Sequence, residues 1–210
     1  MFHLVKGLYD NYNKREEYSI LLLGLENSGK TTFLEKLKEL YVDKNQTYKK
    51  PKRILPTVGQ NVGHVKYDAK VSLKIWDLAG QAELRGMWER YFEVAHGIIF
   101  LVDSGDRSKL EECKEELMKI LNPDEFINDE EKQIDKSIPI LMLANKQDLE
   151  NHLEVEDIKE IFNKVAEHLN ARDSRVLPVS GLKGDGVKEA LEWMVVRLER
   201  NKSNRPPNYK

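Results

Sequence analysis

Residues 24–31 read GLENSGKT and directly follow the apolar run 20–23, ILLL. The run is typical of a buried strand, and a glycine-bounded turn after it indicates a backbone that curls around a ligand. The pattern G-x-x-x-x-G-K-[ST] fits Gly24, Gly29, Lys30 and Thr31. The glycines let successive N–H groups point at phosphate oxygens, the lysine adds positive charge, and the threonine hydroxyl suits Mg²⁺. The stretch therefore predicts a phosphate-binding loop, whereas a glycine turn with a chance lysine is the plain alternative.

The composition indicates one ordinary globular domain. The chain has 210 residues, of which 40% are hydrophobic and 33% charged, and its net charge of -2 excludes a general attraction to nucleic acid or to anionic membranes. Cys113 is the single cysteine, so an internal disulfide is excluded and a reducing compartment is expected. The longest apolar runs, 20–23 and 98–102, are far shorter than the ~20 residues of a membrane-spanning helix. With no signal peptide visible, we expect a protein of the cytosol or of membrane surfaces facing it.

Extended and helical patterns alternate along the chain. Strands are predicted at 18–23, 61–67, 71–77, 97–103, 138–144 and 176–179, and helical periodicity follows in 33–40, 110–121, 158–169 and 187–198. Strands separated by helices favour a parallel sheet covered on both faces, but the short link 68–70 makes its two flanking strands antiparallel. The fold class is therefore α/β, with the P-loop NTPase fold: six strands, mostly parallel with one antiparallel, and helices on both faces. The expected parts are an N-terminal amphipathic helix and linker (1–17), a nucleotide-binding domain (18–200) and a polar C-terminal tail (201–210).

A second motif predicts which base the site binds. Asn145, Lys146 and Asp148 follow the apolar run 138–144, at the carboxyl end of a predicted strand, where open α/β sheets bind ligands. A carboxylate there accepts two hydrogen bonds from the ring N–H and the amine of guanine, whereas adenine would present a lone pair. Taken alone, N-K-x-D is better explained as a polar helix entry. Combined with the phosphate loop, it predicts guanine.

A third motif predicts metal and γ-phosphate contacts. Asp77 ends another predicted strand and can hold Mg²⁺ through a water, while the N–H of Gly80 can bind a γ-phosphate and Gln81 can orient an attacking water. Thr57 offers a second hydroxyl to the metal, although on its own it would be an ordinary turn residue.

In chain order, the phosphate loop (24–31), Thr57, residues 77–81 and residues 145–148 resemble the four motifs of a small GTPase, and the chain resembles the Arf family within that superfamily. The similarity is carried by PTVGQNV (56–62), WDLAGQAELRGMWERYF (76–92), HGIIFLVDSGDR (96–107) and LMLANKQD (141–148). The opening MFHLVKGLY and the close from 172 to 210 resemble the Arf-related branch, including a fungal Arf-like GTPase of the Golgi.

The resemblance implies a role for each matching residue. Gln81 is the expected catalytic residue, Thr31, Thr57 and Asp77 are the expected metal ligands, and Ser180, Gly181 and Leu182 join the guanine box Asn145, Lys146 and Asp148. The expected phosphate contacts are Gly24, Leu25, Glu26, Asn27, Ser28, Gly29, Lys30, Thr31, Thr32 and Gly80.

The chain departs from the family pattern at three places. Ala79 stands where a glycine is common, and Gln60 stands where Arf proteins usually have a phenylalanine of the effector surface. Phe2 replaces the glycine that is myristoylated in Arf proteins, so no acceptor for that lipid exists. Phe2, Val5, Leu8, Tyr9 and Tyr12 still share one helical face, which predicts an amphipathic helix that either packs on the domain or, on activation, contacts a membrane or receptor.

The resemblance implies slow hydrolysis of GTP to GDP with Mg²⁺, and partners of four kinds: an exchange factor, an activating protein, a Golgi membrane receptor and downstream Golgi effectors. It implies a monomer in the cytoplasm that binds the cytosolic face of the Golgi or trans-Golgi network in its GTP state, for vesicle traffic and protein targeting. Two alternatives stay open: a GTP-loaded scaffold with negligible hydrolysis, suggested by Ala79, and an ATP-using nucleotide kinase, which would not need residues 145–148.

Overall fold

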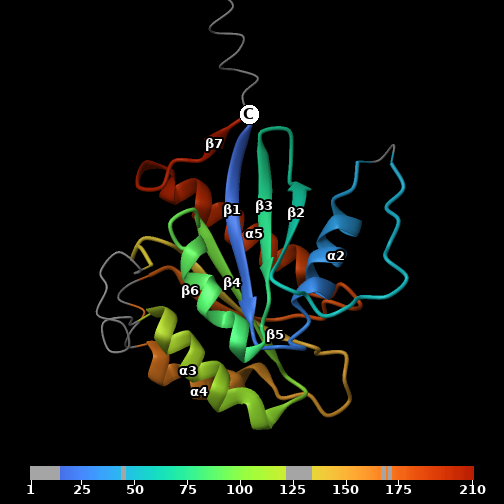
Figure 1. Cartoon of the computed structure of the whole chain (residues 1–210), viewed down its shortest axis with the longest axis vertical. Coiled ribbons are helices and arrows are strands. Elements are labelled where there is room, and N and C mark those ends of the chain that lie inside the picture. The colour runs from blue at the N-terminus through green and yellow to red at the C-terminus, as the bar shows by residue number, and fades with distance from the viewer. Residues whose placement is uncertain (1–14, 44–45, 122–133, 167–168, 170–171) are drawn as a thin grey trace, which may run out of the picture.

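The computed structural model describes residues 15–43, 46–121, 134–166, 169 and 172–210. Its centre is a sheet in the order β2-β3-β1-β4-β5-β6 (Figure 1). The strands are β1 (Glu16–Gly24), β2 (Gln60–Lys66), β3 (Val71–Leu78), β4 (Gly97–Asp103), β5 (Ile140–Asn145) and β6 (Ser174–Pro178). Only β2 runs antiparallel within this path, since it forms a hairpin with β3. The predicted mostly parallel α/β sheet is confirmed, with strand ends that differ from the predicted ones by zero to two residues.

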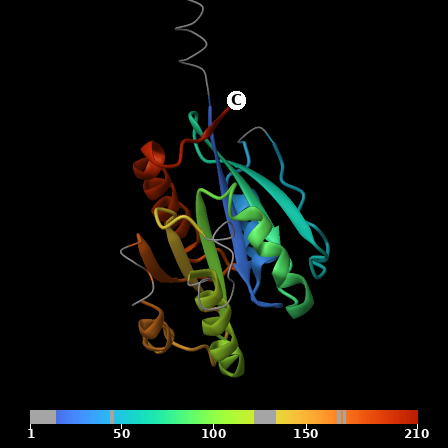
Figure 2. The same cartoon turned by 60° about the vertical axis from the view of Figure 1, so that its left-hand side comes forward.

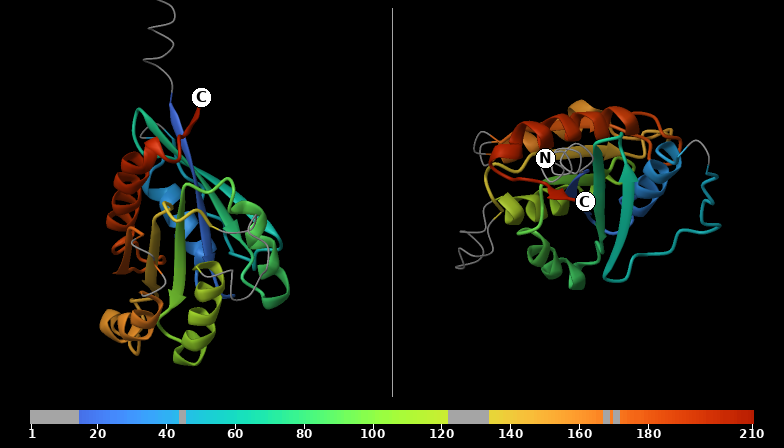
Figure 3. Two further views of the ribbon diagram at one scale, coloured as in Figure 1. Left: turned by 90° about the vertical axis from the view of Figure 1, so that its left-hand side faces the viewer. Right: turned by 90° about the horizontal axis from the view of Figure 1, so that it is seen from above.

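Helices cover both faces of the sheet (Figure 3). One face carries α2 (Lys30–Leu40) and α5 (Val187–Arg200), which pack on alternate residues of β1 such as Ile20 and Leu22. The other face carries α3 (Leu110–Leu121), α4 (Val155–Ala166) and the 3-10 helix η1 (Ala82–Tyr91), which pack on Leu21 and Leu23. Both faces of β1 are therefore buried, which explains why its sequence is an unbroken apolar run. Within the described ranges, no helix is long and apolar enough to cross a bilayer.

The strand order places the ends of β1, β3 and β4 next to one another. The chain turns to one side of β1 to reach β3 and to the other side to reach β4. Open α/β sheets bind their ligands at such a point, outside the carboxyl ends of the strands. The phosphate loop follows β1, and residues 77–81 follow β3, so the topology brings the two motifs together.

The last ten residues contribute structure that the sequence did not indicate. A short 3-10 helix, η5 (Asn201–Ser203), continues α5, and β7 (Asn208–Tyr209) then pairs antiparallel with Glu16 and Glu17 of β1. The count of six strands is therefore one short. The error has a physical cause: β7 has two residues and directly follows two prolines, so it carries no alternation that sequence periodicity could detect.

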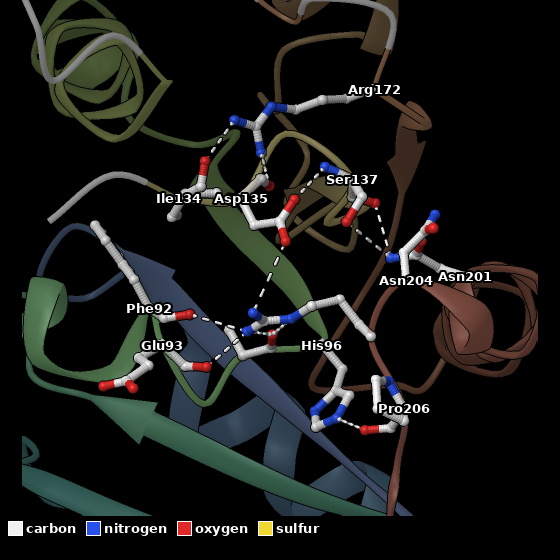
Figure 4. A network of polar contacts seen from close by, with 12 residues as sticks. Phe92, Glu93, His96, Ile134, Asp135, Ser137, Arg172, Asn201, Asn204 and Pro206 are labelled. Carbon is white, nitrogen blue, oxygen red and sulfur yellow. Dashed lines mark hydrogen bonds and ion pairs between the residues drawn. The ribbon is translucent and has the colours of Figure 1, made fainter. Parts of the chain in front are cut away.

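The C-terminal segment, residues 201–210, lies at the opposite end of the sheet from the carboxyl ends of the parallel strands (Figure 2). Figure 4 shows the carbonyl oxygens of Phe92 and Glu93 and the Asp135 carboxylate gathered around one guanidinium, which is that of Arg205. Arg205 also donates to the carbonyl oxygen of Ala95, at 2.6 Å from Nη2. The segment expected to be a polar tail thus joins the loop after η1 to the start of β1. The predicted N-terminal helix of residues 1–17 lies, up to residue 14, outside the described residues.

Candidate nucleotide-binding site

The phosphate loop adopts the curled backbone that its glycines predicted. Gly24, Asn27 and Gly29 have φ values of 139°, 62° and 91°, in the left-handed region that favours glycine. A Cβ on Gly24 would lie 2.3 Å from the carbonyl oxygen of Leu101, and one on Gly29 would lie 2.3 Å from Nδ2 of Asn145. The second glycine leads directly into α2, whose N-terminal N–H groups face the loop. The strand, loop and helix context that decides against a chance match is present.

Lys30 lies inside the loop with its ammonium group prepared for an anion. Its Nζ donates to the carbonyl oxygens of Gly24 at 2.9 Å and Leu25 at 2.8 Å, and only 7% of the residue is exposed. Burial lowers the pKa of Lys30 to about 8, while the nearby Asp77 carboxylate opposes that shift. A buried ammonium surrounded mainly by neutral carbonyls is stabilised by a phosphate, which restores its ordinary pKa.

Three oxygen-bearing side chains meet beside Lys30. The hydroxyl of Thr31 donates to Oδ2 of Asp77 at 2.8 Å and lies 2.9 Å from the hydroxyl of Thr57, which itself lies 3.3 Å from that carboxylate oxygen. Asp77 is fully buried, and burial raises its pKa against the opposing hydrogen bond from Thr31 and the charge of Lys30. Its Oδ1 has no hydrogen-bond partner within range in the described chain, although the side chain of Asn61 lies close enough to lower the pKa. The donor set fits a hard cation such as Mg²⁺, which takes carboxylate and hydroxyl oxygens.

Gly80 and Gln81 border the same cavity. Its volume is about 290 Å³, and it is lined by Glu26, Asn27, Gly29, Lys30, Thr31, Thr32, Ile54, Leu55, Pro56, Thr57, Gly80 and Gln81. A Cβ on Gly80 would come within 2.5 Å of both Nζ of Lys30 and the carbonyl oxygen of Gly24, so only glycine fits there. Nε2 of Gln81 lies 3.4 Å from Oε1 of Glu26, across the mouth of the loop. The structure therefore brings the predicted catalytic glutamine to the predicted phosphate site.

The predicted guanine residues form a second cluster beside the phosphate loop. Nδ2 of Asn145 donates to the carbonyl oxygen of Ser28 at 2.8 Å, and its Oδ1 accepts from the N–H of Gly181 at 2.9 Å. The hydroxyl of Ser180 donates to Oδ1 of Asp148 at 2.6 Å, which leaves the other carboxylate oxygen for a ligand. Leu182 is 58% exposed on the same loop. Asn145 thus holds three loops together, and Asp148 is the residue whose carboxylate is free to contact a base.

Two residues that stabilise this cluster were missed. Oδ2 of Asp103, at the end of β4, accepts from Nζ of Lys146 at 2.6 Å, and Lys146 has an unusual φ of 68°. The hydroxyl of Ser104 accepts from Nε2 of Gln147 at 2.9 Å. The signal that could have found both is the same one that marked Asp77: a polar residue directly after the apolar run of a parallel strand.

Comparison with known proteins agrees with this geometry. The family model described as "ADP-ribosylation factor family" matches residues 5–198. The chain is 57% identical, over 100% of both chains, to ADP-ribosylation factor-like protein 3 of Saccharomyces cerevisiae. It is 40% identical to ADP-ribosylation factor-related protein 1 of Homo sapiens, over 99% of this chain and 97% of that one.

A solved structure shares the fold and holds a nucleotide. The Arl6 BBS3 small GTPase from Trypanosoma brucei, with the bound nucleotide analogue GppNp, superposes with a TM-score of 0.71 at 27% identity, covering 88% of this chain and 98% of that one. The family match spans nearly the whole chain, and the phosphate and base clusters lie together as the fold requires. This chain therefore belongs to the ADP-ribosylation factor family of small GTPases, enzymes that hydrolyse GTP.

Proposed function

We propose that this protein is a molecular switch that cycles between GDP and GTP states with Mg²⁺ and acts at the Golgi. The observation that supports the switch most strongly is the meeting of Thr31, Thr57 and Asp77 at one point. These side chains come from the phosphate loop, the segment before β2 and the end of β3. A ligand that binds all three ties together segments that are free to separate when its contacts are lost.

Mg²⁺ would be held by the hydroxyls of Thr31 and Thr57 and, through water, by Asp77. When bound, the ion neutralises charge on the β- and γ-phosphates. Lys30 binds the same phosphates, Gly80 offers its N–H to the γ-phosphate, and Gln81 orients the attacking water. Asp148 accepts hydrogen bonds from guanine, which explains GTP rather than ATP as substrate and disfavours a nucleotide kinase.

Thr31→Asn tests the metal site. The change removes a hydroxyl ligand, so affinity for GTP should fall about tenfold more than affinity for GDP, because the ion would also neutralise charge on the γ-phosphate, which GDP lacks. Nucleotide affinities measured with and without Mg²⁺ check this, with Thr47→Asn as the control, because Thr47 is exposed and lies outside the cavity lining. Equal losses for both nucleotides would contradict the proposed metal role.

The cycle itself is tested by two measurements on the full chain. The nucleotide that remains bound after gentle purification should be GDP or GTP, and a single-turnover assay should release phosphate slowly and faster with an activating protein. Guanine nucleotide bound without any phosphate release, even with a range of activating proteins, would favour the alternative of a GTP-loaded scaffold.

The proposed regulators are an exchange factor and an activating protein, and the proposed active form is a monomer.

The proposed place of action is the cytosolic face of the Golgi or trans-Golgi network, in vesicle traffic and protein targeting. Its support is the 57% identity over the full length of an Arf-like relative, together with the resemblance of the opening and closing segments to the Arf-related branch. The proposed route of membrane attachment is a Golgi membrane receptor, with Golgi effectors recruited in the GTP state. Imaging of a C-terminally tagged chain tests this. The parent should co-localise with Golgi markers, and the Thr31→Asn variant or a variant without residues 1–14, which leaves β1 whole, should be distributed diffusely.

A further inference from the structure

Two side chains of η1 donate hydrogen bonds back to the backbone that precedes the helix. Nε1 of Trp88 donates to the carbonyl oxygen of Ala79 at 2.9 Å, and Nε of Arg85 donates to the carbonyl oxygen of Gly80 at 2.9 Å. These two carbonyl groups belong to the peptide units on either side of Gly80. Both units are therefore bonded to the same helix, through two different side chains.

A peptide unit is planar and trans, so its C=O and its N–H point in opposite directions. The bond from Trp88 to the Ala79 carbonyl therefore also fixes the direction of the N–H of Gly80. In the same way, the bond from Arg85 to the Gly80 carbonyl fixes the N–H of Gln81. With the carbonyl oxygens turned toward η1, the N–H groups are turned away from it. The backbone here borders the phosphate cavity, within 2.5 Å of Lys30 for a Cβ placed on Gly80.

The two donors are themselves held in place. Trp88 is 2% exposed and belongs to the hydrophobic core between η1 and the sheet, and Ala79 is 1% exposed. The Arg85 side chain is 10% exposed, and its Nη2 and Nη1 lie 2.7 Å from Glu112 and 3.3 Å from Glu116, both on α3. A buried carbonyl that loses its donor cannot recover the bond from water without local rearrangement. The two peptide units are thus fixed by the core on one side and by α3 on the other.

We propose that Trp88 and Arg85 are positioning residues of the phosphate site, which aim the N–H groups of Gly80 and Gln81 into the cavity and thereby favour GTP over GDP. The proposal rests on the proposed function, in which the N–H of Gly80 binds the γ-phosphate. GDP lacks that phosphate, so aiming this N–H, and the N–H of Gln81 beside it, at the γ-phosphate position contributes to GTP affinity alone. If the two side chains only stabilised η1, their loss would affect both nucleotides equally.

The experiment compares conservative variants of the full chain. Trp88→Phe keeps an aromatic side chain in the core but has no N–H, and Arg85→Lys keeps a cation for Glu112 and Glu116 but has no Nε donor. We expect affinity for GppNp to fall about 5- to 10-fold in each variant, which is the effect of one lost hydrogen bond, and affinity for GDP to change less than about twofold. The matched control is Trp193→Phe, because Trp193 is 6% exposed on α5, outside the cavity lining. Its two affinities should match those of the parent.

Each result separates the inference from the function on which it rests. If the parent binds neither guanine nucleotide, both are wrong. If the parent binds both nucleotides but the variants leave the GppNp to GDP affinity ratio unchanged, the positioning role alone is wrong. Thermal unfolding of each variant is measured alongside, and if Trp88→Phe does not fold, the ratio in Arg85→Lys decides.

Discussion

The two ends of the parallel strands use their polar groups in different ways. At the carboxyl ends, the phosphate loop and β3 leave buried polar atoms without a protein partner in the described chain, namely Oγ of Ser28 and Oδ1 of Asp77. At the other end, Arg205 bonds the carbonyl oxygens of Phe92, Glu93 and Ala95, and both ring nitrogens of His96 are engaged, by the N–H of Ser19 and the carbonyl oxygen of Pro206. Among the described residues, Nε of Arg172 and Nε of Arg197 are unpaired as well, but their guanidinium groups have other partners, the carbonyl oxygens of Ile134 and Asp135 for Arg172 and the Trp193 ring for Arg197. Buried polar groups are costly unless paired, and the unpaired oxygen atoms of Ser28 and Asp77 belong to the residues proposed to hold the phosphates and the metal.

The comparison predicts that changes at the first end alter nucleotide binding and chemistry, whereas changes at the second alter stability. The largest effect is expected for Asp148→Asn. The variant exchanges an acceptor oxygen for a donor, so GTP affinity should fall about 1000-fold and a xanthine nucleotide should bind better, since unpaired buried polar groups discriminate strongly. Titration with GTP and XTP measures both. A variant that still prefers GTP would show that Asp148 does not contact the base.

Gln81→Leu should give the next largest effect. Leucine cannot orient water, so hydrolysis stimulated by an activating protein should fall about 100-fold or more, while GTP affinity stays near that of the parent. Single-turnover hydrolysis with saturating activating protein is the measurement, and the affinity for GppNp is the control. Hydrolysis at the parent rate would show that Gln81 does not orient the attacking water.

The lowered pKa of Lys30 leads us to expect a smaller effect, a dependence of nucleotide affinity on pH. Burial lowers its pKa to about 8 without ligand, and a bound phosphate favours the charged form. Raising the pH from 8 to 9 should therefore weaken nucleotide binding about fivefold, with uptake of a proton on binding that calorimetry in buffers of different ionisation enthalpy detects. The same shift makes the stability of the nucleotide-free fold increase as the pH rises from the lowered pKa to the ordinary value of 10.5, because the unfolded chain binds the extra proton in that range. Lys30→Met should abolish this pH dependence.

Arg205→Ala tests the end of the sheet that lies away from the cavity. Removing the guanidinium leaves the carbonyl groups of the loop after η1 without their donor, so the free energy of unfolding should fall by about 1–3 kcal/mol. Affinities for GDP and GppNp should stay within about twofold of the parent, since Arg205 lies at the end of the sheet away from the cavity. Denaturant unfolding and nucleotide titration test this together, with exposed Lys136→Ala as a surface control. A selective loss of GTP affinity would show that the C-terminal segment is coupled to the nucleotide.

The site was largely predictable because its residues lie in short contiguous motifs. Residues 24–31 need only neighbours in the sequence to form their turn, and residues 145–148 follow a strand whose apolar run is unmistakable. The contacts between these motifs were harder to predict from the sequence. The contact of Asn145 with guanine stays a prediction, and the structure adds that Asn145 bonds to Ser28 and Gly181, which lie 117 and 36 residues away. The amide side chain of Asn145 indicated that it could donate and accept hydrogen bonds, but only the fold determined its partners.

Local spacing and apolar periodicity were enough to predict the phosphate loop, the base motif, the parallel sheet and the family. Tertiary structure alone decided that Arg85 and Trp88 hold the backbone around Gly80, and that residues 201–210 return to β1 and to the loop after η1. The physical reason is shared by both cases. The acceptors are backbone carbonyl groups, which every residue has, so no pattern of side chains marks them in the sequence. The carbonyl group of Ala95, to which Arg205 donates, lies 110 residues away from it in the chain.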